Sequence, residues 1–385
     1  MLTAEVARHD AGAAQFVHWG ATSQDVLDTA QVLVARRALA LVDRDLGGLV
    51  AALLRVAEAH GDAPVLGRTL LQPAQVVSFG FKVAAWVAPL VRAQARLHER
   101  GAAALQLQLG GAVGTRAAMG EHGDAVAARM AASLGLRAPA AAWHTQRDEW
   151  VGLACELGLL AGSLGKFAKD VSLMAQAEVG ELAEPSGAGR GGSSAMPHKR
   201  NPVASMIALA AALRAPQHVA AMLAAMPQEH ERGLGNWQAE LAESGALLAC
   251  VHGAVAALRQ AAEGLQVDAV RMGRNIESLR GLVFAEALSV RAARVIGKPA
   301  AHEWAEALSR RAVAEDAHLR ELARAAIARH EQLHAAIPDD ELDALFDAAR
   351  PAAHASALAR AQLAALAPQA EALRRAAPWK DSDEP

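Results

Sequence analysis

RDEWVGLACELGLLAGSLGKFAKDVSLMAQAEVGE, residues 147–181, is a long stretch in which apolar side chains recur at steps of four and three. The residues that repeat are Leu153, Leu157, Leu160, Leu164, Phe167, Val171 and Met174. This near-heptad spacing is typical of a helix that buries one stripe in a bundle. At a rise of ~1.5 Å per residue the helix would be about 50 Å long. We therefore expect a bundle of unusually long helices.

Other parts of the chain carry similar helical patterns, and few segments alternate as strands do. Long helices are expected at residues 23–60, 73–101, 203–226 and 237–265. After residue 267 the helical segments become shorter and more charged, and the chain ends in an acidic segment, 380–385. The prediction is an all-α protein with three parts: residues 1–22, a central bundle at 23–267 and a helical C-terminal domain at 268–385.

Composition excludes several functional classes. The chain is 53% hydrophobic but only 3% aromatic, it has no tyrosine, and its formal net charge is −3. Small aliphatic side chains favour closely packed helices, and the absence of a basic tract argues against nucleic acid. Two cysteines provide no disulfide framework. The first ten residues do not resemble a signal peptide, and apolar runs such as 203–213 are too short to cross a bilayer. We expect a soluble, cytoplasmic protein.

A glycine-rich loop ends in Gly-Ser-Ser-Ala-Met-Pro-His-Lys-Arg-Asn-Pro, residues 192–202. Closely spaced glycines allow backbone amides to converge on an anion, and Arg190 and Lys199 add positive charge. Asn201 and Pro202 suit the start of a new helix. The alternative is a solvated interhelical loop that only caps this helix.

This loop resembles the signature of the fumarase/aspartase superfamily, Gly-Ser-Ser-x-Met-Pro-x-Lys-x-Asn-Pro, at every fixed position. The resemblance implies that Ser193 exchanges a proton with the carbon beside a substrate carboxylate. It implies that Lys199 and Asn201 bind that carboxylate, and that Ser194 and Met196 lie against the substrate.

A second segment, residues 18–25, reads His-Trp-Gly-Ala-Thr-Ser-Gln-Asp. Thr22 and Asp25 have the spacing of a capping box at the start of a helix. The segment also resembles the His-x-Gly-x-Thr-Ser-x-Asp block of the same superfamily, which implies that His18, Thr22 and Ser23 contact substrate.

Two further segments resemble the superfamily in the same way. Residues 143–148 contain Thr-Gln-Arg-Asp, which implies that Gln146 and Arg147 face the site; the alternative is a solvated helix start. Residues 226–232 resemble a segment that supplies a substrate-binding arginine, here Arg232, although the acidic residues there would also suit a helix N-terminus.

Within the superfamily the chain is most similar to the bacterial 3-carboxy-cis,cis-muconate cycloisomerases. The stretches that carry this resemblance are residues 17–25, 143–148, 159–169, 191–203, 225–235 and 281–287. It implies lactonisation of a tricarboxylate in protocatechuate (β-ketoadipate) degradation, with no metal, nucleotide or redox cofactor. It also implies a homotetramer in which each site is built from three chains, so the segments of His18, Gln146 and Ser193 are expected to meet across chains.

Adenylosuccinate lyase shares the signature loop and is the alternative reading. Lyases of the superfamily carry Arg-Thr-His-x-Gln in a further conserved region, where the histidine helps to protonate the leaving group. Residues 68–72 here read Arg-Thr-Leu-Leu-Gln, with Leu70 in place of that histidine. Leucine cannot donate a proton, whereas a carboxylate leaving group with a pKa near ~4 needs no acid. Leu70 therefore favours lactone chemistry.

Two observations keep other classes of protein open. Members of the family have a full helical domain before the segment that corresponds to His18. The first 22 residues here are therefore expected to be a remnant of that domain, either because the chain is truncated or because its start is misassigned. The alternative function is then that of an inactive protein that still assembles. Residues 330–334 read His-Glu-Gln-Leu-His, a zinc-protease pattern. No downstream motif offers a third ligand, so we do not expect a metal site.

Overall fold

The computed structural model describes residues 1–186, 191–192, 196 and 199–379. Helix α5 (Asp148–Met174) buries the predicted apolar stripe, and each of the seven residues from Leu153 to Met174 named for it is at most 5% exposed. The helix is shorter than predicted, because the chain turns after Met174 and Gly180 adopts a positive φ of 60°. Glu181 then lies in the interior, where its carboxylate pairs with Arg68 at 2.6 Å.

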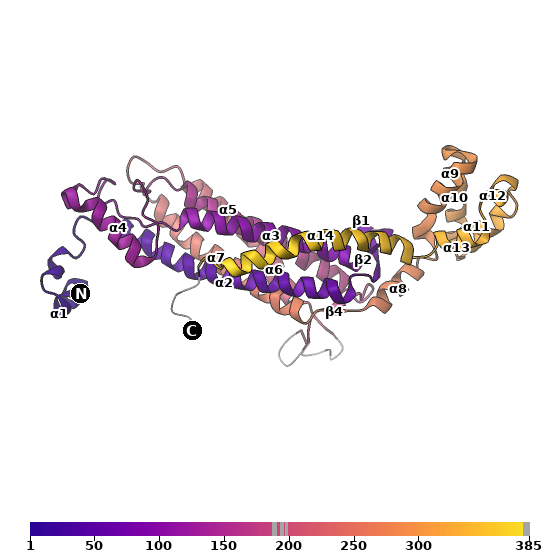
Figure 1. Cartoon of the computed structure of the whole chain (residues 1–385), viewed down its shortest axis with the longest axis horizontal. Coiled ribbons are helices and arrows are strands. Elements are labelled where there is room, and N and C mark those ends of the chain that lie inside the picture. Colours follow the sequence, from indigo (N-terminus) through magenta and orange to yellow (C-terminus); the bar gives the residue numbers. More distant parts are fainter. Residues whose placement is uncertain (187–190, 193–195, 197–198, 380–385) are drawn as a thin grey trace.

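Figure 1 shows a long bundle in which α5 lies beside the other long helices. These are α2 (Ser23–His60), α3 (Phe79–Ala104), α6 (Val203–Ala225) and α7 (Asn236–Glu263). The predicted bounds of α2 are confirmed, and those of α6 and α7 are confirmed to within two residues. Leucine, valine and alanine side chains of all five helices form one apolar core.

The predicted helix at 73–101 is wrong at its start, because residues 73–78 belong to a strand. β1 (Pro64–Thr69) and β2 (Gln72–Ser78) form an antiparallel hairpin, and α3 begins only at Phe79. β-branched Val76 and Val77 favour the strand, and the Ser78 hydroxyl accepts the Phe81 amide at 3.2 Å to start the helix.

The segment before α6 is closed at its base by a second small sheet. β3 (Leu182–Ala183) pairs with β4 (Gln266–Val267), which follows α7. The predicted cap at Asn201 is wrong, because α6 starts at Val203 without a side-chain cap from the residue before it. The Glu184 carboxylate instead accepts the amides of Ala204 and Ser205 at 2.9 and 2.8 Å. A carboxylate suits this position, since it satisfies free amides at the positive end of the helix dipole.

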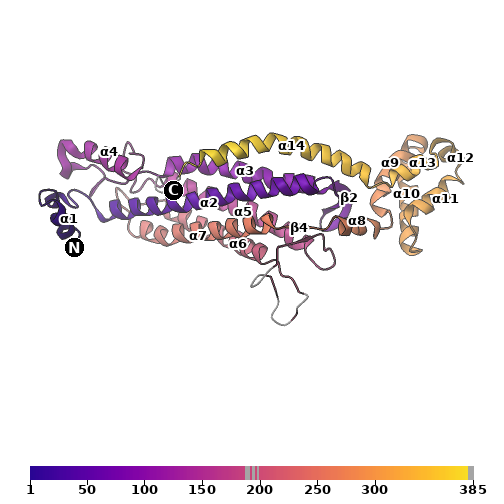
Figure 2. The ribbon, with the colours of Figure 1, turned by 60° about the horizontal axis from the view of Figure 1, so that its bottom comes forward.

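Smaller helices lie at the two ends of the bundle (Figures 1 and 2). One end holds α1 (Leu2–His9), η1 (Ala13–Phe16), η2 (Ala117–His122) and α4 (Gly123–Leu134). The other holds α8 (Ala269–Glu277), η3 (Leu282–Phe284), α9 (Ala285–Ile296), α10 (Lys298–Ala314), α11 (Leu319–Ile327), α12 (Glu331–Ala336) and α13 (Asp339–Leu345), most of which share a second apolar cluster. The last helix, α14 (Ala349–Ala376), returns along the bundle against α3 and α2.

Three bundle helices are long and apolar enough to cross a membrane by length and composition: α5, α6 and α7. The expectation that the apolar run at 203–213 is too short is therefore wrong, because this run is only half of α6. The most apolar windows of α5 and α7 are 56% and 39% buried, but that of α6 is only 22% buried. One face of α6 thus carries exposed apolar side chains, which include Met206, Ile207 and Leu213.

Candidate active site

The predicted site residues of the His18 segment lie where α2 begins. Thr22 has an extended backbone and forms the predicted capping box with Asp25, which is confirmed. The Thr22 amide donates to Asp25 Oδ2 at 2.9 Å. His18 and Ser23 are exposed, and His18 has a positive φ of 62°. A positive φ is uncommon for residues other than glycine, but histidine adopts it more readily than most, so this turn is sterically accessible to His18.

Asp25 holds this turn from behind. Its carboxylate is 2% exposed and also accepts the amides of Gly110 and Gly111, each at 2.9 Å. His144 Nε2 lies 2.7 Å from Asp25 Oδ1, so this nitrogen carries the proton that is shared. Burial by itself raises the pKa of Asp25, but the hydrogen bonds from His144, Thr22 and the two glycines outweigh it and hold the pKa below its ordinary value.

Arg232 reaches the same turn from the segment that joins α6 to α7. Its NH1 group donates to Thr22 Oγ1 at 2.6 Å, although the two residues are 210 positions apart. The structure thus brings together two of the residues for which the superfamily implies substrate contact. They offer a guanidinium and a hydroxyl at one surface, which suits a carboxylate.

Arg147 lies beneath this surface and has its own partners. It is 2% exposed, its guanidinium pairs with Asp28 at 2.9 Å and also with Glu240, and it stacks over the Trp143 ring at 4.5 Å. Burial lowers the pKa of Arg147, but the Glu240 hydrogen bond and the Asp28 charge outweigh it and raise the pKa. The expected alternative, a solvated arginine, is wrong. Its neighbour Gln146 is exposed.

The signature loop is described only at its base. Ser193 and Ser194 lie outside the described residues. The Asn201 amide donates to the Gly191 carbonyl at 2.8 Å, and Gly192 and Arg200 form an antiparallel bridge. Lys199 and Met196 are exposed, and the Lys199 amide donates to the Met196 carbonyl at 3.0 Å. The two stems of the loop are therefore paired where they leave the bundle.

We call the surface formed by Thr22 and Arg232 the Thr22 surface, and the paired residues 191–192 and 200–201 the loop base. The two lie at opposite ends of α7. Arg232 precedes the first residue of this helix, whereas β4, which pairs with β3 below the loop, follows its last residue. α7 has 28 residues, which corresponds to about 42 Å. Figures 1 and 2 both show α2 beginning at one end and β4 lying far along the bundle. One chain therefore does not bring Lys199 and Asn201 to Thr22 and Arg232.

Leu70 lies at the tip of the β1–β2 hairpin. It is 96% exposed and has a positive φ of 51°. Arg68, two residues before it, makes two hydrogen bonds of 2.9 and 2.6 Å to Glu181, which directly precedes β3. The hairpin is thus tied to the base of the signature loop.

The His-Glu-x-x-His segment has a structural explanation. His330 precedes α12, and its Nδ1 accepts the Leu333 amide at 3.4 Å, so this ring caps the helix. Across the described part of the chain, no group of three or more His, Cys, Asp or Glu side chains is arranged to hold a metal ion.

Sequence reasoning gave no functional role to Asp25, His144, Asp28 or Glu240, which hold the candidate site residues in place. Asp25 was noted only as a helix cap. The sequence pattern could have indicated that Glu240 is buried, because this residue lies on the same face of α7 as Trp237 and Leu247. A carboxylate on an apolar helix face indicates a buried cation, although not which one.

Comparison with known proteins gives a consistent result. A lyase family model matches residues 2–216. The 3-carboxy-cis,cis-muconate cycloisomerase of Pseudomonas aeruginosa is 51% identical over 348 residues, 90% of this chain and 75% of that protein. The enzyme of the same name from Bradyrhizobium diazoefficiens is 48% identical over 90% of this chain and 76% of that protein. The crystal structure of the 3-carboxy-cis,cis-muconate lactonizing enzyme of Pseudomonas putida matches with a TM-score of 0.86 and 42% identity, covering 97% of this chain and 81% of that one.

Asp25 generates a testable pH dependence. Because its pKa is lowered in the folded state, its contribution to stability is complete above the unfolded-state pKa of about 4 and is lost as the pH falls through the folded value. We expect Asp25→Asn to lower the free energy of unfolding at pH 7 by about 2–3 kcal/mol. Between about pH 5 and pH 2, the free energy of unfolding of the Asp25→Asn variant should also fall less steeply with pH than that of the parent.

The measurement is denaturant unfolding at a series of pH values and one protein concentration. Asp124→Asn is the matched control, because the Asp124 side chain is 93% exposed and its loss should change stability by less than about 0.5 kcal/mol. Parallel acid profiles for the parent and Asp25→Asn would contradict the role given to this carboxylate.

Proposed function

Since the chain belongs to the lyase family, that is, to the fumarase/aspartase superfamily, we propose that it converts 3-carboxy-cis,cis-muconate to 4-carboxymuconolactone. The observation that carries the proposal is the identity of 47–51% to three enzymes of that name over 86–90% of this chain. An enzyme with this activity is an intramolecular lyase of protocatechuate degradation. Leu70 agrees with this activity, because the hairpin tip offers no acid for an amine-type leaving group.

The reaction is the reverse of a β-elimination within one molecule. A carboxylate oxygen of the muconate adds to the conjugated double bond, and the C–O bond of the γ-lactone forms. The electron pair of the double bond moves toward the carbon beside another carboxylate, and a proton adds to that carbon. Negative charge gathers on this carboxylate before the proton arrives, so amides and cations held around it would lower the barrier.

The proposed roles follow from the chemistry of each side chain. Ser193 exchanges the proton at carbon, and the neighbouring amides and Lys199 make its hydroxyl more acidic. Lys199 and Asn201 bind the carboxylate that gains charge, with Ser194 and Met196 against the substrate. The remaining carboxylates bind to the surface formed by His18, Thr22, Ser23, Gln146 and Arg232.

We assign Arg147 a positioning role. Its guanidinium is already shared by Asp28 and Glu240, and a buried arginine that keeps two carboxylates has little to offer a third. Through Asp28 it fixes the first turns of α2, and through Glu240 it fixes α7 near Arg232. The proposal thus keeps Arg147 in the site as support for the residues that contact substrate.

A complete site requires more than one chain in this proposal. The length of α7 separates Arg232 from the loop base by about 42 Å, and the exposed apolar face of α6 offers a surface on which copies can associate. We infer a homotetramer in which the loop of one chain meets the Thr22 surface of another. We place this assembly in the cytoplasm, with no membrane or nucleic-acid partner.

Ser193 and Lys199 should differ in their kinetic effects. We expect Ser193→Ala to lower kcat by about 10²-fold or more, because it removes the group that exchanges the proton. Lys199→Ala should chiefly raise KM, because it removes a binding charge. Lactonisation assays give both constants, and light scattering checks that the assembly is retained. A Ser193→Ala enzyme with near-parental kcat would assign the proton to another group.

The shared site is tested by mixing two inactive variants. Ser193→Ala and Arg232→Ala place their defects in the two halves of the site. If the halves come from different chains, hybrid assemblies contain some sites with neither substitution, and activity should return to as much as about a quarter of the parental value. Co-expression with two affinity tags isolates the hybrids. Purified hybrids that stay inactive would show that the halves do not combine across chains.

Leu70 tests the choice between lactonisation and elimination. The protein should cyclise 3-carboxymuconate and should not cleave adenylosuccinate, argininosuccinate or malate. Leu70→His should not raise the lactonisation rate, because a carboxylate leaving group needs no acid. The backbone accepts the change, since histidine tolerates a positive φ better than most residues.

Leu71→His is the matched control, because Leu71 is also exposed and has a positive φ of 65°. Cleavage of adenylosuccinate by the parent, or a large gain in lactonisation specific to Leu70→His, would favour the lyase reading.

A further inference from the structure

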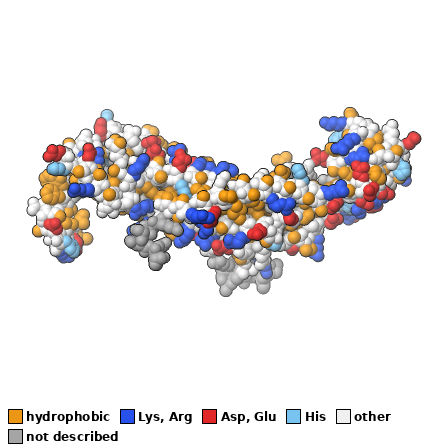
Figure 3. All heavy atoms as spheres, viewed as in Figure 1, with side chains coloured by type: hydrophobic (Ala, Val, Ile, Leu, Met, Phe, Trp, Pro, Cys, Tyr) orange, Lys and Arg blue, Asp and Glu red, His pale blue; other side chains and the backbone are white. Residues whose placement is uncertain are grey.

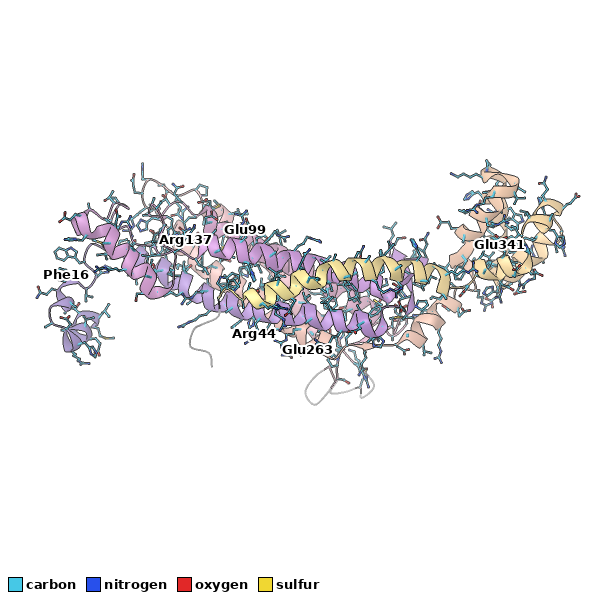
Figure 4. The ribbon with its side chains drawn as sticks, viewed as in Figure 1. Phe16, Arg44, Glu99, Arg137, Glu263 and Glu341 are labelled. Atoms are coloured by element: carbon cyan, nitrogen blue, oxygen red, sulfur yellow. The ribbon has the colours of Figure 1, made fainter. Side chains whose placement is uncertain are left out.

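An arginine-rich cavity lies between α2, α7 and α14, away from the proposed active site. Its volume is about 480 Å³, within the range of small-molecule sites. It is lined by Arg37 and Arg44 of α2, Arg259 of α7, Arg374 of α14, and Asp43 and Trp379. Figure 4 labels Arg44 on α2 and Glu263 at the end of α7, and Figure 3 shows basic side chains gathered on this part of the surface.

One glycine within α2, Gly48, makes room for part of this cluster. A Cβ atom at Gly48 would lie 2.6 Å from Arg259 Nε, and one at Gly47 would lie 3.5 Å from Arg374 Cγ. Glycine destabilises the interior of a helix. Here Gly48 lets the Arg259 side chain lie directly against α2, whereas a Cβ atom at Gly47 would only be in ordinary van der Waals contact with Arg374.

The guanidinium groups that line the cavity keep hydrogen-bond donors that no other described residue uses. Arg44 and Arg259 share Asp45, Arg259 also bonds Glu263, and Arg374 bonds Glu371. These bonds use one or two of the five N–H groups of each arginine. Arg37 makes no hydrogen bond or ion pair with any other described residue.

The carboxylate of Asp43, which also lines the cavity, makes no ion pair with these arginines. It is 5% exposed and is occupied by His98 at 2.6 Å and by Gln94 at 2.8 Å. Asp45, Glu263 and Glu371 pair directly with Arg44, Arg259 and Arg374, so among the four lining arginines Arg37 is the one without a direct partner in the described part of the chain. An anion in the cavity would meet several N–H donors beside the charge of Arg37.

Trp379 forms an apolar wall of the cavity. It is 6% exposed, contacts the His98 ring edge-on at 5.3 Å, and fits a slot that a Cβ atom at Gly101 would close, at 2.3 Å. The sequence that follows is Lys-Asp-Ser-Asp-Glu-Pro, residues 380–385, outside the described residues. Six residues can span up to about 20 Å, so acidic side chains of this segment are within reach of a cavity that Trp379 itself lines.

We propose that this cavity is a second carboxylate-binding site, specific for a polycarboxylate. The ligand is either the acidic segment 380–385 or a free small polycarboxylate, since both present carboxylates to the same arginines. The site is separate from the Thr22 surface, because 15 helical positions of α2 between Thr22 and Arg37 correspond to about 22 Å. It does not depend on the proposed activity.

The test uses tricarballylate as the probe and calorimetry as the readout. All proteins carry Lys199→Ala and Arg232→Ala, so that the proposed active site does not contribute. One arm keeps the native tail, and the other carries Asp381→Asn, Asp383→Asn and Glu384→Gln. In each arm Arg37→Gln with Arg44→Gln is compared with Arg55→Gln, an exposed arginine of the same helix outside the cavity.

We expect the double substitution to weaken tricarballylate binding about tenfold or more, and Arg55→Gln to leave it unchanged. Binding that appears only in the neutralised-tail arm assigns the site to the segment 380–385. Equal binding in both arms assigns it to a free polycarboxylate. The proposal is overturned if neither arm binds the probe, or if the double substitution has no more effect than Arg55→Gln.

Discussion

Backbone hydrogen bonding gives an α-helix a rise of ~1.5 Å per residue, and the five long helices of this bundle hold one another along a shared apolar core. α7 cannot shorten or bend sharply while α2, α5 and α6 pack along it. The turn at Thr22 and the base of the signature loop therefore stay at opposite ends of a fixed spacer. The length of α7 therefore fixes the distance between these two segments, both within one chain and on the surface where another copy would contact them. In our proposal, the geometry of a complete site is thus a consequence of helix length.

The end of the bundle that carries the Thr22 turn is stiffened by buried charge. Asp25 with His144, joined by a hydrogen bond, and Arg147 with Asp28 and Glu240, joined by ion pairs, form two clusters of residues that are at most 2% exposed. Such clusters add little stability, because desolvation offsets the attraction between the charges. Removing one partner is costly, however, so the arrangement admits few alternatives. We infer that these clusters fix the orientation of Thr22 and Arg232 at the surface.

Much of the fold could be predicted from local patterns, and the errors have physical causes. The bounds of α2 follow from a capping box at Thr22 and an apolar repeat that continues to His60. Residues 73–78 were missed because their alternation is short and runs directly into the apolar pattern of α3, although the whole hairpin lies within residues 64–78. The cap of α6 was missed because Glu184 lies 19 residues before Val203, outside any local pattern at the helix start. In the candidate site, the superfamily resemblance singled out Thr22 and Arg232, which contact one another, but the burial of Arg147 depends on the fold.

The exposed face of α6 explains why composition alone misjudges this helix. By length and hydropathy α6 matches a membrane span, yet its buried residues are mainly alanines, and small residues on that side let α5 and α7 approach closely. The larger apolar residues, Met206, Ile207 and Leu213, lie on the opposite side. Charged side chains are costly against lipid, yet α6 also carries exposed Arg214, and Glu243 of α7 lies 2.6 Å from His218 Nδ1 of α6. In our proposal, association with other copies of the chain covers this apolar face. For this reason we read the hydropathy of α6 as the mark of an interface between subunits.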